Sequence, residues 1–400
     1  MHKGNGVKTS LVCHAGVVNQ AIITNVTAIL FVPFMRLYGF TYVQLGFLTA
    51  AGFAAQLCAD FLLLFFIDRF SPRLLACIAA VLSCTGLIFY GILPYVCTDS
   101  MYFSIIAATI LFAFAGGMLE VVLSNAAEAL PKSEGGGLCL LHTIYAWAQV
   151  GLALFLLGFF SVFGSVSWNA AVLILAIVPA FVLVLLIRTD LPKTEKHVPV
   201  RSAFHPFYLL SILAVFFGYG AEVVMNQWIS SFAASTFGAE TGAAVGCALF
   251  AACLGVGGTL YVFAERRKNK PPIPMLIGSA LAACAMYLLA ALVDVPMLGL
   301  VFAILCGAFV GVLSPGAMSA AADFLPKSGG WMLASLALSQ DIGAAVLPAV
   351  SGAITQAQSM RAAFFVLSSV PFAAAVCLFS MLMMRRKNQD FGASLGKNKN

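Results

Sequence analysis

Twelve long apolar segments divide the 400-residue chain, and they constrain its fold more than any other feature. Crossing the hydrocarbon core of a bilayer takes about 20 residues in a helix, and each segment reaches about that length. Membrane strands would instead alternate polar and apolar residues over about ten positions. A charged fraction of only 9% is also too small to cover the surface of a soluble fold. The segments cover approximately residues 11–36, 41–67, 73–96, 101–130, 138–163, 167–188, 204–235, 239–264, 273–293, 297–325, 330–357 and 360–384.

The basic residues predict the orientation of these segments. With the N-terminus inside, the cytoplasmic parts of the chain hold all of the 21 Lys and Arg residues except Arg36 and Arg361. This bias follows the positive-inside rule, and one missed span would reverse it. We therefore expect an all-α, multi-pass protein of a bacterial inner (plasma) membrane with both termini in the cytoplasm. The net charge of +6 then reflects contact with anionic lipid, and no nucleic-acid partner is expected.

The two halves of the chain resemble each other. Residues 126–133 (AAEALPKS) recur at the equivalent place in the second half as residues 321–328 (AADFLPKS). In the same alignment Glu120 falls opposite Pro315. A repeat at half the chain length is typical of transporters whose substrate site lies between the halves, near the middle of the membrane. The predicted parts are a six-helix half at 1–188, a cytoplasmic linker at 189–203, a pseudo-symmetric six-helix half at 204–385 and a cytoplasmic tail at 386–400.

Short motifs in these segments are similar to those of the major facilitator superfamily. Residues 64–73 (LFFIDRFSPR) keep the Asp-Arg core and the last basic residue of its loop motif but lack both glycines. Residues 116–120 (GGMLE), 220–222 (GAE) and 340–343 (QDIG) resemble the fucose-permease-like branch of that superfamily. The resemblance implies the twelve-helix major facilitator fold and uptake of a sugar or related small polar solute together with protons. It also implies that Glu120 is the proton-linked carboxylate.

Three acidic residues within the predicted spans are the candidates for proton coupling: Glu120, Glu222 and Asp341. An ionised side chain at the bilayer centre costs about 2.5–3.5 kcal/mol on insertion scales, so its presence points to a function. Surroundings of low dielectric favour the neutral form of a carboxyl group, which lets it bind and release a proton. Hydrogen bonding between helices is the structural alternative, and for Asp341 close helix packing or gating competes as well.

Polar side chains also recur on single faces of predicted helices. Tyr219, Glu222 and Asn226 follow i, i+3, i+7 spacing, and a carboxylate, an amide and an aromatic ring are the usual groups for binding sugars or polyols. His142 begins a similar face and could relay protons or simply be solvated. Hydrogen bonds between helices would use the same residues. The predicted substrate-binding residues are Asn19, Gln20, Asn25, Glu120, Tyr145, Gln149, Tyr219, Glu222, Asn226, Trp228 and Gln340.

Another group of charged residues is predicted at the cytoplasmic helix ends. In the superfamily such groups form a latch that keeps the cytoplasmic side closed, so the resemblance implies a gate. Ordinary charges at helix ends are the alternative. Asp60, one helical turn after Gln56, is expected closer to this gate than to the membrane centre. The predicted gate residues are Asp68, Arg69, Arg73, Glu128, Glu265, Arg266 and Asp323.

The sequence lacks the motifs of several other function classes. No G-x-x-x-x-G-K-[ST] loop is present, so we expect no nucleotide and transport driven by gradients. No zinc-ligand spacing or catalytic motif is present either, so we expect no metal, no cofactor and no enzymatic activity. We expect a monomer that works with a small polar solute, protons and the lipid bilayer.

Two alternatives to proton-coupled uptake remain open at this point. The first is a proton-driven exporter of amphipathic or drug-like compounds, whose cavity would be lined mainly by aromatic residues. The chain holds 34 Phe, but the Gly-Pro pair of the drug antiporters is absent from the fifth segment. The second is a non-transporting membrane receptor, which would have a closed, dry centre. Polar groups that converge on a central cavity would favour uptake of a polar solute.

Overall fold

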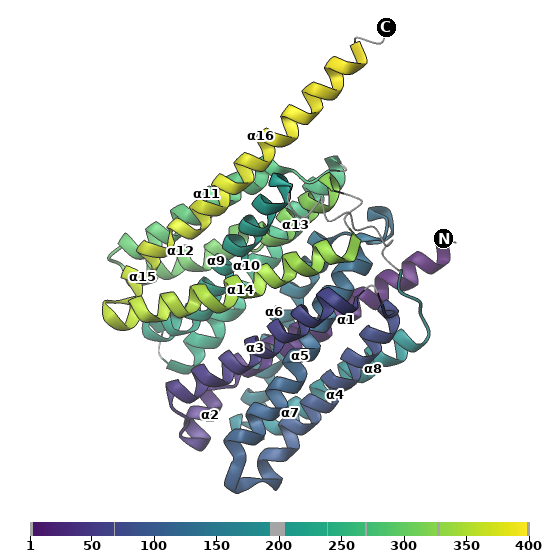
Figure 1. Cartoon of the computed structure of the whole chain (residues 1–400). Helices are drawn as coiled ribbons and strands as arrows, with labels where there is room; N and C mark the ends of the chain where they lie inside the picture. Colours follow the sequence, from purple (N-terminus) through teal and green to yellow (C-terminus); the bar gives the residue numbers. More distant parts are fainter. Residues whose placement is uncertain are drawn as a thin grey trace.

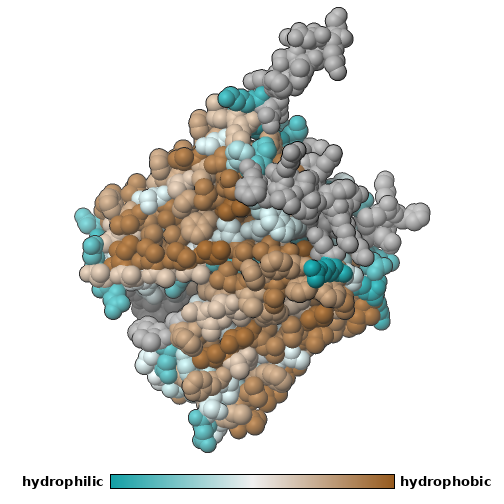
Figure 2. Space-filling model, viewed as in Figure 1, coloured by the Kyte–Doolittle hydropathy of each residue, from teal (hydrophilic) through white to brown (hydrophobic). Residues whose placement is uncertain are grey.

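A computed structural model shows the helical membrane architecture directly. It describes residues 3–67, 69–192, 205–237, 239–268, 270–325 and 329–397. Within these ranges, 12 helical spans are long and apolar enough to cross a membrane. Hydrophobic side chains cover the sides of the molecule and hydrophilic ones gather toward its ends (Figure 2). Helices are the expected structure here, because each one satisfies its own backbone hydrogen bonds where water is absent.

The helices form two groups that follow the chain, purple to blue for the first half and teal to yellow for the second (Figure 1). The predicted linker lies largely outside the described residues, so the domain boundaries stay a prediction. The first group is α1 (Lys3–Ile29), α2 (Phe31–Tyr38), α3 (Tyr42–Phe66), α4 (Pro72–Val96), α5 (Met101–Glu128), α6 (Leu138–Phe163), α7 (Trp168–Leu175) and α8 (Ile177–Ile187). The second group is α9 (Pro206–Phe237), α10 (Ala239–Lys268), α11 (Ile273–Leu292), α12 (Pro296–Val310), α13 (Leu313–Phe324), α14 (Gly329–Ala357), α15 (Met360–Leu367) and α16 (Ser369–Lys397).

Prolines explain why some spans consist of two helices. Proline has no N–H, so the carbonyl group four residues before it loses its helical partner. α1, α7 and α15 each end four residues before a proline, at Pro33, Pro179 and Pro371. Similarly, α12 ends five residues before Pro315, which leaves residues 311–312 between α12 and α13. This last break lies at the cavity described below, where interrupted helices commonly occur in transporters.

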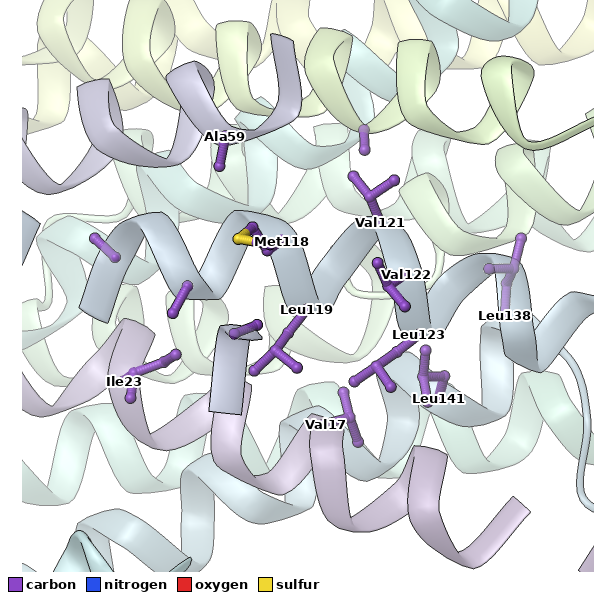
Figure 3. Packing of buried hydrophobic residues seen from close by; sticks show 14 of the residues in the cluster. Val17, Ile23, Ala59, Met118, Leu119, Val121, Val122, Leu123, Leu138 and Leu141 are labelled. Atoms are coloured by element: carbon purple, nitrogen blue, oxygen red, sulfur yellow. The ribbon is translucent and has the colours of Figure 1, made fainter. Parts of the chain in front are cut away.

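α5 is the central helix of the first half. Figure 3 shows it between α1 and α3, with Leu123 beside Val17 of α1 and Ala59 of α3 above Met118. Gly117 permits the close approach of α3, because a Cβ atom there would lie 2.8 Å from a backbone oxygen of that helix. α5 also packs closely against α4, and it contacts α6 and α14. A polar residue of α5 that faces α14 is therefore directed toward the second half.

The two halves contact each other mainly through α6 with α10 and α3 with α14. On α10, Gly258 lies against Thr143 of α6, so that a Cβ atom at Gly258 would be 2.5 Å from the Thr143 Oγ1 atom. The α6–α10 contact extends to the end of the bundle where α6 begins and α10 ends. We call this the basic end, because Lys132 and Arg266 flank these two helix ends.

Candidate functional site

A cavity lies between the two halves. It is lined from α1, α5 and α6 in the first half and from α9, α10, α13 and α14 in the second, together with residues 311–312 between α12 and α13. Its volume is about 30 Å³, which is room for very few water molecules. Sites for small solutes usually measure about 300–1,000 Å³, so solute binding requires the halves to move apart. The polar residues that line the cavity are Gln20, Glu120, Ser124, His142, Thr143, Tyr145, Tyr219, Glu222, Tyr261 and Gln340.

Glu120 lies at the centre of a network of amide side chains. Its Oε2 atom accepts hydrogen bonds from Gln20 Nε2 at 3.0 Å and from Gln56 Nε2 at 3.2 Å. Gln340 Nε2 donates to the other oxygen, Oε1, and Gln340 Oε1 accepts from Ser314 Oγ at 2.5 Å. These donors come from α1, α3 and α14. Glu120 is thus a buried acid, only 4% exposed, that joins the two halves without a cationic partner in this network.

Two more acids extend the network along the contact between the halves. Gln56 Nε2 also donates to Asp341 Oδ1, at 3.4 Å. The Asp60 carboxyl on α3 meets the Asp341 carboxyl on α14 at hydrogen-bonding distance, and both side chains are completely buried. Asp60, expected closer to the gate than to the membrane centre, thus lies beside two candidate proton-coupling residues, Asp341 and Glu120. Asp60 follows Gln56 by one helical turn, and the face that they share is turned toward α14 and α5.

An ion pair joins the halves at the basic end. Lys132 lies in the short 3₁₀ helix η2 (Lys132–Glu134), and its Nζ atom is 3.0 Å from Glu265 Oε1 on α10. Ser319 Oγ donates to the same oxygen at 2.7 Å. The Glu265 side chain is only 3% exposed, so its charge depends on these two donors. Glu265 is one of the predicted gate residues, whereas Lys132 is not among them.

Other predicted gate residues form ion pairs that do not join the two halves. Arg73 pairs at 2.9 Å with Asp190, which follows α8 at the start of the predicted linker, and it also donates to the Ile187 carbonyl of α8. Asp323 pairs with Arg385 at 2.6 Å in the second half. Their role in a gate therefore stays a prediction. Of the others, Arg69 and Arg266 are exposed, Glu128 is partly buried, and Asp68 lies outside the described residues.

A comparison of the sequence with protein-family profiles identifies the family to which this chain belongs. The profile of the Major Facilitator Superfamily matches residues 13–330 and, in a second match, residues 272–397. The chain belongs to the major facilitator superfamily. It is therefore a secondary transporter and a multi-pass membrane protein, and the predictions of this superfamily and of no enzymatic activity are confirmed.

Solved major facilitator structures share the fold of this transporter across nearly its whole length. A transporter of the superfamily, FucP, in the outward conformation has 17% identity and a TM-score of 0.74, covering 93% of this chain and 98% of its own. A variant of the E. coli fucose:proton symporter FucP has 17% identity and a TM-score of 0.73, with 94% and 99% coverage.

The proton:xylose symporter XylE bound to 6-bromo-6-deoxy-D-glucose has 13% identity and a TM-score of 0.76, covering 95% of this chain and 96% of its own. At such identities the likeness of these solved structures establishes the fold alone, which confirms the predicted major facilitator architecture. No curated protein sequence matches the chain significantly.

Some of the predicted substrate-binding residues of this transporter line the cavity and others do not. Asn25 is next to the lining, because its Nδ2 atom donates to the Tyr145 hydroxyl at 2.8 Å. Asn19 instead donates to Ser83 of α4 at 3.2 Å, which is a contact within the first half. The predicted residues in the lining are Gln20, Glu120, Tyr145, Tyr219, Glu222 and Gln340, whereas Gln149, Asn226 and Trp228 are not part of it.

Helical periodicity explains why some of these residues line the cavity and others do not. It shows which residues share a face, as for Tyr219, Glu222 and Asn226, but not how deep the cavity reaches along the helix. Gln56 was missed as a partner of the acids, and Ser314 was missed as the partner of Gln340. The i, i+4 spacing of Gln56 and Asp60 inside an apolar segment was the available signal for Gln56. Assignment of these residues to substrate binding stays a prediction.

We expect Lys132→Met to weaken the contact between the halves at the basic end. Removing one partner of a buried ion pair costs about 3–5 kcal/mol, but Lys132 is 26% exposed, so we expect on the order of 1–2 kcal/mol. Maleimide labelling of the native, buried Cys139 in the cavity lining, located by mass spectrometry, should then become roughly tenfold faster.

The matched control is Arg73→Met, which breaks an ion pair that does not join the two halves. It should leave the Cys139 labelling rate unchanged. The exchanged pair, Lys132→Glu with Glu265→Lys, should restore slow labelling in part. Equal labelling rates in wild type and Lys132→Met would show that the pair does not hold the basic end closed.

Proposed function

We propose that this major facilitator is a proton-coupled importer of a small, uncharged, polar solute of the sugar class, working by alternating access. The observation that carries the proposal is Glu120, a buried acid in the cavity lining whose hydrogen bonds come from both halves. A group in this position can link its protonation both to solute binding and to the relative position of the halves. We place the basic end in the cytoplasm of a bacterium, following the positive-inside rule.

The chemistry of the cavity supports a polar, uncharged solute. Hydroxyl and amide groups such as those of Tyr145, Tyr219 and Gln340 can bind several sugar hydroxyls at once. The described lining includes the acids Glu120 and Glu222 but neither Lys nor Arg, so an anionic solute would meet uncompensated negative charge. The exporter alternative requires an aromatic, apolar cavity, whereas the aromatic residues of the described lining are three tyrosines, each with a polar hydroxyl group. The relatives of similar fold are named as fucose and xylose symporters, which agrees with this class.

Protonation of Glu120 changes what the network can bind. As a carboxylate, Glu120 only accepts hydrogen bonds, and the amides of Gln20, Gln56 and Gln340 supply them. A proton on one oxygen turns that oxygen into a donor, so it needs an acceptor in place of an amide N–H. A solute hydroxyl oxygen in the cavity would be such an acceptor. Protonation and solute binding would then favour each other, which is the linkage that a symporter requires.

The test is uptake by the purified protein in proteoliposomes. With the outside more acidic than the inside, we expect one of a panel of neutral monosaccharides and polyols to accumulate. Its addition should make the outer medium more alkaline, because protons enter with it. Sugar phosphates and sugar acids in the same panel should not be accumulated. Protein-free liposomes and a protonophore, which removes the gradient, are the controls.

The other outcomes point to the alternative functions. Loss of amphipathic cations from preloaded vesicles in exchange for entering protons would support an exporter. A protein that binds a solute but moves none of the panel in either direction would support a receptor. Accumulation that persists after the protonophore would show that protons are not the coupling ion.

A further inference from the structure

The contact between Asp60 and Asp341 lies outside the cavity lining, and the coupling scheme for Glu120 does not use it. The two carboxyl groups come from α3 and α14, so they face each other across the contact between the halves. Both side chains are 0% exposed. Apart from each other, neither oxygen of Asp60 nor Oδ2 of Asp341 has a hydrogen-bond partner among the described residues.

A carboxylate has acceptor oxygens only, so two carboxylates cannot form a hydrogen bond with each other. Two negative charges in contact and away from water would repel each other strongly, and such pairs hold a proton between them. We propose that Asp60 and Asp341 share one proton, and that this second proton site holds α3 against α14 only while the proton is bound. The proton-sharing contact is inferred from the geometry, whereas its use in transport rests on the proposed proton coupling.

Among the described residues, the groups around the pair offer no counter-charge. The titratable residues that face it are Glu120 on α5 and, beside Asp341, Tyr219 on α9. Glu222 on α9 and Tyr145 on α6 lie one step further away, next to Glu120 and Tyr219. The ion pairs described above lie elsewhere. Loss of the shared proton would therefore place uncompensated negative charges on both sides of the contact, which favours separation of α3 from α14.

Gln56 links this site to Glu120. Its Nε2 atom donates both to Glu120 Oε2, at 3.2 Å, and to Asp341 Oδ1, at 3.4 Å. One amide is thus shared between the two sites, so a change of protonation at one alters the hydrogen bond available to the other. The fit of α3 is also tight, because a Cβ atom at Gly117 would lie 3.0 Å from Asp60 Oδ1.

Infrared spectroscopy can test whether the proton is shared. The full-length wild-type protein should show the carbonyl stretch of a protonated carboxylic acid, and this band should disappear as the pH rises. Asp60→Asn and Asp341→Asn should each remove the same band, because each destroys the pair. Glu120→Gln should leave it in place, as should Asp99→Asn, an acid-to-amide control at an exposed position. A band that neither Asp60→Asn nor Asp341→Asn removes would overturn the proposal.

A distance measurement tests the contact itself. Spin labels replace the lipid-facing residues Phe65 of α3 and Val346 of α14, in protein whose exposed Cys58 is changed to serine. In the wild type we expect the distance to lengthen as the pH rises. Asp60→Asn should keep it short at every pH, because its amide donates to the Asp341 carboxylate without a proton. A distance with the same pH response in Asp60→Asn as in the wild type would overturn the proposal.

Neither measurement needs solute or a gradient, so its result is independent of the proposed function. If Asp60→Asn does not fold, Asp341→Asn can replace it. The amide at position 341 would then donate to the Asp60 carboxylate, so the distance should again stay short at every pH. If the wild type shows the shared proton but takes up no solute, the shared proton is supported and the proposed function is contradicted. If the wild type takes up solute with protons but the α3–α14 distance does not respond to pH, the proposed function is supported and the shared proton is contradicted.

Discussion

Replacing Glu120 with glutamine should abolish proton-driven accumulation while leaving exchange of solute across the membrane. The amide has nearly the same shape as the acid and can still form hydrogen bonds in the cavity, but it cannot carry a proton at any working pH. A gradient of one pH unit provides about 1.4 kcal/mol per proton, enough for about tenfold accumulation with one proton per solute. We therefore expect about tenfold accumulation by the wild type and none by Glu120→Gln.

Counterflow is the measurement that separates coupling from binding. Vesicles preloaded with unlabelled solute should still exchange it for labelled solute in the Glu120→Gln variant, without any gradient. Asp99→Asn makes the same chemical change at an exposed position and should accumulate solute like the wild type. If Glu120→Gln still accumulates solute against its gradient, the coupling proton is carried elsewhere, and Glu222 and Asp341 become the candidates.

The extent to which solute accumulates also shows how many protons accompany each solute molecule. If the pair of Asp60 and Asp341 releases its proton in each transport cycle, two protons accompany each solute. The same gradient then allows about hundredfold accumulation, because each proton contributes about a factor of ten. A limit near tenfold in the wild type would mean that the shared proton stays in place during transport.

The fold could be predicted because its determinants are local. Hydropathy marks each span, and the distribution of Lys and Arg checks their number, so neither depends on knowing which helices touch. Glu120 could be predicted for a similar reason, since an acid within an apolar segment requires an explanation wherever the helix packs. The structure places Glu120 in the lining of the cavity between the halves, and its role in proton coupling stays a prediction.

Partners across the contact between the halves could not be predicted in this way. Asp60 lies six residues before the end of α3, so its position along the chain suggested the helix-end charges. The surroundings of the Asp60 side chain depend on how α14 packs against α3. No feature near Asp60 in the sequence indicates that Asp341 faces it. Lys132 was likewise visible in the repeated Leu-Pro-Lys-Ser motif, but Glu265, its partner, lies in the other half.

The internal repeat clarifies why the two halves contribute different groups to the cavity. Glu120 and Pro315 occupy equivalent positions of the repeat, and both line the cavity. The first half supplies an ionisable side chain there, whereas Pro315 interrupts the helix in the second half. This interruption brings Gly311 and Val312 to the cavity opposite the amide network of Glu120. A rigid acid-bearing helix thus faces a discontinuous one, an arrangement common at transporter sites.

A leucine at Gly258 should slow transport strongly by keeping the basic end from closing. Gly258 faces Thr143 across the α6–α10 contact, where even a Cβ atom would come within 2.5 Å of the Thr143 Oγ1 atom. One turn away, the Trp147 indole N–H donates to Thr259 Oγ1 at 3.2 Å, so the helices have little freedom to adjust. Overpacking of this kind costs about 1–3 kcal/mol. Since only the closed basic end bears this cost, the equilibrium should move toward its open form by roughly 5- to 150-fold.

The expected result is a folded protein that takes up solute at least about tenfold more slowly, with faster maleimide labelling of Cys139. Gly278→Leu is the matched control, because a Cβ atom at this α11 position has no atom within 4 Å, and it should change neither quantity. Thr143→Gly in the Gly258→Leu background should recover part of the uptake by returning space to the contact. If Gly258→Leu transports normally with Cys139 still protected, the basic end closes by a route other than the α6–α10 contact. Alternating access in this protein would then depend on α3 and α14, where Asp60 and Asp341 meet.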